Sequence, residues 1–154
     1  MLKEDNRFLY AVIAGIIGAI AKDILSLLFK FMGIVNYFTW NVAADFFVDG
    51  KEIFGFWGHV VGGLTDLFLG SLIGVIFAMM IEVFGPKHYI LKGIGLAWLV
   101  WGILVGFVLH LAKQLFTIIP YTALIYFLTL ITHALFGIIL SFAYIKLAKI
   151  KDND

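Results

Sequence analysis

Four apolar runs dominate this sequence, and each is long enough to cross a lipid bilayer as a helix. They cover residues 8–32, 59–84, 90–112 and 122–147. The hydrocarbon core of a bilayer is about 30 Å thick, and crossing it takes about 20 helical residues. Backbone amides in lipid must bond within their own segment, and the runs lack strand-like alternation, so helices are the expected elements. The sequence therefore predicts an all-α integral membrane protein built as a bundle of four transmembrane helices.

The overall composition supports this class of protein. Hydrophobic residues make up 63% of the 154 residues and charged residues 14%, and the mean hydropathy is +1.06. Soluble domains carry roughly 25% charged residues. The net charge of +1 gives no reason to expect a nucleic-acid partner, and the absence of cysteine excludes disulfide and thiolate chemistry. We expect residues 1–154 to form one transmembrane domain in contact with the lipid bilayer, without a cofactor.

Basic residues near the ends of the runs predict the orientation. They flank the ends that would share one side of the membrane: Lys3, Arg7, Lys87, Lys92, Lys146, Lys149 and Lys151. The segment 33–58 instead carries more acidic than basic residues. Because basic residues are enriched in cytoplasmic connections, both termini are predicted to be cytoplasmic and 33–58 to lie outside. The N-terminal run is of full spanning length without a cleavage site, so no signal peptide is expected.

The long first loop, residues 33–58, is rich in aromatic residues and interrupted by glycines. Trp and Tyr favour the headgroup level of a membrane. The loop can therefore be an aromatic belt that lies in the interface. Alternatively, it can be a lid over an outward-facing cavity.

Small and polar residues share one face of the second run. At helical spacing this face contains His59, Gly62, Gly63, Asp66, Gly70, Gly74, Ala78 and Glu82. Small residues let helices approach closely in lipid, and ionisable groups are costly unless they point into the protein. The glycine spacing recurs in the third run. We therefore expect helix packing at Gly63, Gly70, Gly74, Gly95, Gly102 and Gly106.

Two short similarities indicate an internal 2+2 repeat. IAKDIL at 20–25 is similar to LAKQLF at 111–116, and Thr65-Asp66 before Gly70 is similar to Thr132-His133 before Gly137. A repeat of this kind would relate the first two helices to the last two about an axis along the membrane normal. The alternative to a true repeat is chance similarity, because apolar helices of low sequence complexity often share short matching segments.

Ionisable residues are predicted to gather in the outer half of the bundle. A rise of about 1.5 Å per residue places Asp23 and Asp66 at nearly the same depth. The predicted polar site consists of Asp66, Asp23, Lys22, His59, His110 and His133. Two nearby carboxylates oppose each other's ionisation, and histidine titrates near neutral pH, so this set suits proton uptake from outside. The alternative is structural: ion pairs, interfacial residues and a neutral, hydrogen-bonded His133.

Several motifs resemble the YagU-like family of bacterial inner-membrane proteins. They are Gly58-His59, IEVFGPKHY at 81–89, GFVLHLAKQLF at 106–116 and the fourth run around His133, with AVIAGIIGAIAK at 11–22 in the first run. The resemblance implies a small multi-pass protein of the bacterial inner membrane. It supports the placement of the histidines and implies no catalytic residue.

Three functions remain open on the sequence. Proton-responsive transport or channel activity, carrying a proton or small ion, is the leading one, and a homo-oligomer is expected because four helices enclose little volume. A structural or accessory membrane protein would instead keep its ionisable residues paired and use the first loop as a partner surface. A membrane-embedded metal site or enzyme is the least favoured, because no metal-binding or nucleophile motif occurs in the sequence.

Overall fold

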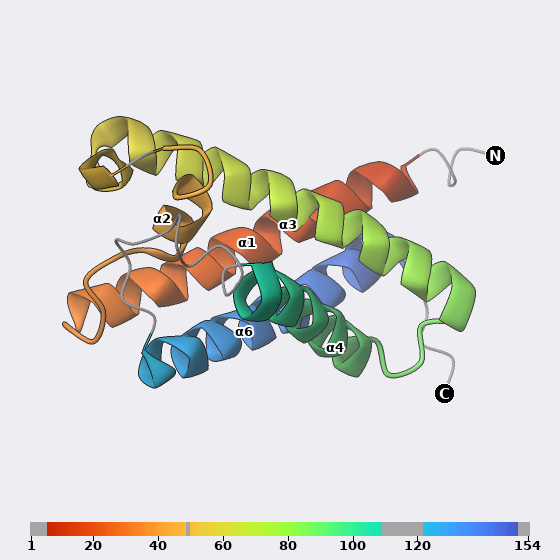
Figure 1. The fold of residues 1–154 in the computed structure, drawn as a ribbon. Helices are drawn as coiled ribbons and strands as arrows, with labels where there is room; N and C mark the ends of the chain where they lie inside the picture. The colour runs from red at the N-terminus through yellow and green to blue at the C-terminus, as the bar shows by residue number, and fades with distance from the viewer. Residues whose placement is uncertain (1–5, 49, 109–121, 151–154) are drawn as a thin grey trace.

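The computed structural model describes residues 6–48, 50–108 and 122–150. Regular structure in these residues is entirely helical (Figure 1). In chain order the elements are α1 (Arg7–Phe31), α2 (Thr39–Ala44), η1 (Gly50–Phe54), α3 (Phe56–Phe84), α4 (Tyr89–Trp101), η2 (Gly102–Val108) and α6 (Ala123–Leu147).

Three of these helices, α1, α3 and α6, are long and apolar enough to cross a membrane. They match the predicted runs 8–32, 59–84 and 122–147, although α3 begins earlier, at Phe56. This helix ends where Gly85 takes a positive φ of 71° ahead of Pro86, a backbone conformation that suits glycine. The predicted all-helical class is confirmed for the described residues.

The fourth apolar run is less regular than predicted. The α-helix α4 has 13 residues, and the chain continues as η2, a π-helix of 7 residues. The π-helix is rare in proteins. Where it occurs, it is mostly a single-turn bulge within an α-helix, and such bulges are often found at functional sites. The last part of the predicted run 90–112, residues 109–112, lies outside the described residues.

The helices pack around α1. It lies between α3 and α6, and α4 packs on α6 (Figure 1). Small residues allow the closest approaches, since a Cβ added at Gly15 would meet the backbone of Gly70 and Ser71, and one added at Gly93 would meet the backbone of Gly137. Helix α1 begins, and α6 ends, at the end of the bundle where α3 connects to α4 (Figure 1).

The apolar core occupies the half of the bundle that contains the start of α1 and the end of α6. Its largest fully buried side chains are Phe77, Phe136, Leu140 and Tyr144. The rings of Phe77 and Tyr144 meet edge to face, with centroids 5.8 Å apart. An exposed ion pair between Arg7 and Glu82, 3.4 Å long, lies at the same end. Lys22, the buried charged residue among those that the structure describes, lies in the other half.

The first loop is a folded cover on that other half. Its helix α2 packs against α3, where a Cβ added at Gly62 would meet the carbonyl of Trp40. Asn41 is fully buried; its side chain donates to the carbonyl of Ile53 (2.8 Å) and accepts from the backbone N–H of Phe38 (2.9 Å). These contacts give the loop defined tertiary structure, as a lid requires.

Candidate polar site in the bundle

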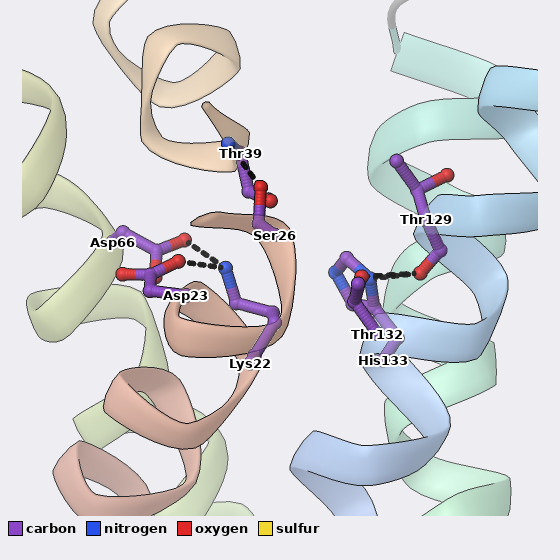
Figure 2. A network of polar contacts seen from close by, with 8 residues as sticks. All are labelled: Lys22, Asp23, Ser26, Thr39, Asp66, Thr129, Thr132 and His133. Atoms are coloured by element: carbon purple, nitrogen blue, oxygen red, sulfur yellow. Dashed lines mark hydrogen bonds and ion pairs between the residues drawn. The ribbon is translucent and has the colours of Figure 1, made fainter. Parts of the chain in front are cut away.

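Lys22 of α1 is the centre of the polar site. Its Nζ lies 2.9 Å from Oδ1 of Asp23 and 2.9 Å from Oδ1 of Asp66 (Figure 2). Only 3% of the lysine is exposed, and the side chains of the two aspartates are 15% and 12% exposed. The long lysine side chain reaches both its own neighbour on α1 and the carboxylate on α3. The predicted residues Lys22, Asp23 and Asp66 are thus brought together.

The charges in this trio do not balance when all three groups are ionised. One ammonium faces two carboxylates, which leaves a net charge of −1. Among the described residues, the buried Oδ2 of Asp66 has no hydrogen-bond partner. An unpaired charge in an apolar interior is costly unless a compensating charge or a hydrogen-bond donor lies beside it.

His133 of α6 lies across the bundle interior from the trio. Its Nδ1 lies 2.7 Å from the backbone carbonyl of Thr129, and a carbonyl only accepts, so Nδ1 donates this bond. The neutral ring then keeps Nε2 as an acceptor. Figure 2 shows this second nitrogen on the side of the ring that faces Lys22. The histidine is therefore oriented as a proton acceptor toward the interior.

Two cavities meet between Asp66 and His133. The α2 cavity, about 70 Å³, is lined by residues of α2, α3, η2 and α6. The central cavity, about 50 Å³, reaches Lys22 and Phe136. Both are lined by Asp66, Leu69, Leu104 and His133. A cavity needs only about 10–15 Å³ of such space to hold one water molecule, so both have room for water.

His59 belongs to a different group of contacts. Its Nδ1 accepts a hydrogen bond from Nε1 of Trp40 at 3.0 Å and lies 3.3 Å from Nδ2 of Asn41. With Asp23 it lines a more open groove of about 390 Å³ between α1 and α3. The predicted site is therefore divided, with His59 outside the trio and held by the first loop.

The remaining predicted site residue, His110, lies outside the described residues, and so do Lys113 and Gln114. Among the residues that are described, no group of three or more histidine, aspartate and glutamate side chains could hold a metal ion. Any metal site that includes His110 stays a prediction.

The predicted packing glycines divide into two sets. A Cβ at Gly70 would meet Ala19 and Gly15, and one at Gly74 would meet the backbone of Ala11, so both lie at helix contacts. A Cβ at Gly63, Gly95 or Gly102 would meet no heavy atom within 4 Å among the described residues. Packing at these three stays a prediction, and Gly63 lines the groove beside His59. The surroundings of Gly106 lie outside what the structure describes.

The structure adds contacts between α1, the first loop and His59 that helical periodicity does not identify. Ser26, buried on α1, accepts the backbone N–H of Thr39 at 3.0 Å and so fixes the start of α2 (Figure 2). Trp40 and Asn41 hold His59. Helical spacing places Ser26 on the same face of the first run as Lys22, but the sequence does not indicate its partner in the loop, because such contacts depend on how the loop folds back.

Comparison with protein-family models, with curated proteins and with solved structures finds no match for this chain. The function has to be inferred from the site itself.

Proposed function

We propose that this chain is a multi-pass membrane protein in which Asp66 takes up and releases a proton as part of proton-responsive transport. The observation that carries the proposal is the uneven ion cluster: one buried ammonium between two carboxylates, with Asp66 opening onto cavities that it shares with His133. An ionisable group inside a membrane bundle is a functional candidate because its burial is costly.

The molecular surface supports a membrane location. Large apolar side chains on the long helices are exposed, among them Ile24, Leu64, Phe68 and Phe142. An exposed apolar surface of this extent is typical of contact with lipid or another protein. The proposal includes the bacterial inner membrane, on the resemblance to YagU-like proteins, with both termini cytoplasmic. It also includes a homo-oligomer, because the cavities of one chain are small.

A second candidate function, a structural or accessory protein, is favoured by one observation. Lys22 satisfies one oxygen of each aspartate, so the cluster can hold α1 to α3 as a fixed ion pair without any proton exchange. The folded loop would then be the surface that binds a partner.

Reconstituted vesicles distinguish the two functions. Wild-type vesicles with a trapped pH-sensitive dye should acidify faster than protein-free vesicles after an acid step outside. Asp66→Asn keeps the shape but removes the titration, and should acidify like empty vesicles. The matched control is Glu82→Gln, which removes an exposed carboxylate from the other end of the same helix. It should behave like wild type.

The proposal is wrong if wild-type vesicles acidify no faster than empty ones, or if a folded Asp66→Asn variant keeps the full rate. Circular dichroism and size-exclusion chromatography in detergent establish folding before the vesicles are compared.

A further inference from the structure

The α2 cavity has features of a ligand site beyond a proton site. Its walls are mostly apolar, with Val42 and Ala43 from α2, Leu69 from α3 and Leu104 and Val105 from η2. Its polar residues are few: Thr39 of α2, Asp66 of α3, and Thr129 and His133 of α6. Apolar walls with a small number of placed polar groups are typical of small-molecule sites.

Two side chains of this cavity, one from α3 and one from α6, present hydrogen-bond acceptors. Asp66 keeps Oδ2 without a partner among the described residues, and His133 keeps Nε2 as an acceptor because its Nδ1 donates to Thr129. The hydroxyl of Thr129 is already used, since it accepts from Trp101 and donates to the carbonyl of Tyr126. Lys22 lines the central cavity and not this one. A ligand that complements Asp66 and His133 therefore has to donate hydrogen bonds.

The charge of the site selects a cation. The trio of Lys22, Asp23 and Asp66 sums to −1 when ionised, so a positive ligand beside Asp66 would balance it. Ca²⁺ requires six to eight oxygen ligands and Mg²⁺ a near-ideal octahedron. One carboxylate, two threonines and a histidine do not supply either set. An ammonium group needs only acceptors and tolerates apolar walls.

The size of the site limits the ligand. About 70 Å³ of space, at about 10–15 Å³ for each water-sized probe, corresponds to a molecule of a few heavy atoms. The π-helix beside the cavity, which supplies Leu104 and Val105, is of a kind frequent at functional sites.

We propose that the α2 cavity binds a small ammonium-type cation, ammonium or a methylated amine, with Asp66 as its counter-charge and His133 as a second acceptor. The inference rests on the proposed function in one respect: it names the species that would share Asp66 with the proton.

Thermal unfolding in detergent at neutral pH tests the proposal with methylammonium chloride as the probe. A ligand that binds only the folded protein raises its Tm. The Tm of the wild type should therefore rise with methylammonium concentration above the value in equal NaCl. Tetraethylammonium chloride should give no rise, because it is too large for the cavity.

Two variants locate the binding. Asp66→Asn removes the counter-charge and should lose the methylammonium-specific rise. Ala43→Leu narrows the cavity from α2 while it leaves the residues of the ion cluster unchanged, and should also lose the rise. A wild-type Tm that is the same in methylammonium and NaCl overturns the inference. A rise with tetraethylammonium, or a rise retained by either folded variant, overturns it as well.

The result is separable from the vesicle experiment, which uses no methylammonium. Proton flux that depends on Asp66, without a methylammonium effect, overturns this inference alone. A methylammonium effect that depends on Asp66, without proton flux, supports the inference and overturns the proposed function.

Discussion

Lys22 is the side chain on which the polar site depends. It is buried between two carboxylates that lie 2.9 Å away, and removing one partner of a buried charge cluster leaves the others uncompensated. The lysine is thus a stabilising group as well as a charge in the site.

We expect Lys22→Met to lower the free energy of unfolding by about 3–5 kcal/mol, because it leaves two buried carboxylates without a cation. Reversible unfolding in mixed micelles measures the change. The double variant Lys22→Met with Asp66→Asn should be more stable than Lys22→Met alone, since one of the uncompensated charges is removed. If Lys22→Met were as stable as wild type, the cluster would contribute nothing to the fold.

Tyr37 in the first loop makes the stability of the folded chain depend on pH in the alkaline range. Its side chain is buried against Ile125, and burial, together with the nearby Tyr126, raises the pKa of its phenol above the ordinary value. The unfolded chain therefore loses this proton before the folded chain does. The contribution of Tyr37 to stability is complete below about pH 10 and decreases as the pH rises above that value.

Accordingly, the free energy of unfolding should fall above about pH 10 by up to about 1.4 kcal/mol per pH unit on account of this one group. Tyr37→Phe should remove that part of the slope while keeping the ring packed. Tryptophan fluorescence during unfolding at a series of pH values measures it. An unchanged slope in the phenylalanine variant would show that the loop tyrosine is ionised equally in both states.

In α4, two glycines about half a turn apart differ in whether they contact another helix. Gly93 faces Gly137 and Ser141 of α6, whereas Gly95, two residues later, is exposed. Two residues rotate a helix by about 200°, so the two positions lie on opposite faces. Because both are in one helix, they make a matched pair.

Gly93→Ala should destabilise the bundle by forcing α4 away from α6. Gly95→Ala should be neutral or stabilising by up to about 1 kcal/mol, because alanine favours helix over glycine and space is open there. The Tm of the two variants in the same detergent provides the measurement. Equal Tm values would contradict the packing of α4 on α6 through Gly93.

This pair also shows why the sequence predicted some faces and not others. On α3, the ionisable Asp66 marks the interior, and the stripe through Gly70 and Gly74 is correctly phased. In its described part the third run has no buried charge, and both its outward-facing and its interior sides are apolar. Lipid is as apolar as leucine, so hydropathy cannot orient such a helix. The glycine spacing there did not single out Gly93, which makes the described contact with α6.

The same reasoning explains the outcome for the polar site. Depth along two regular helices placed Asp23 and Asp66 at one level, and a shared lysine joins them. The position of His59 depends on contacts with Trp40 and Asn41. These two residues lie in a loop whose sequence has no helical periodicity from which its fold could be predicted. Whether helices one and two repeat in three and four also stays a prediction, because 111–116 lies outside the described residues. Gly70 and Gly137 do lie at corresponding close contacts.

The arrangement of the whole chain predicts which connections share a side of the membrane. The start of α1, the end of α6 and the α3–α4 connection lie at one end of the bundle, and α2 and η1 lie at the other (Figure 1). Lys51 and Lys87 are exposed at opposite ends, and the chain has no cysteine of its own.

An impermeant thiol reagent applied to intact cells should label Lys51→Cys and leave Lys87→Cys unlabelled until the membrane is opened. This result is expected if the first loop is outside and both termini are cytoplasmic. The reverse labelling would invert the orientation, and labelling of both positions on intact cells would contradict a transmembrane arrangement.

The length of α3 has a mechanical consequence. Its 29 residues span about 43 Å, more than the roughly 30 Å of a hydrocarbon core, and a long helix adapts to that mismatch by tilting. The cover α2 sits on the first turns of this helix, at Gly62. A thinner bilayer that tilts α3 further would carry α2 with it. We therefore expect the thickness of the membrane to change the shape of the cavity between α2 and α3.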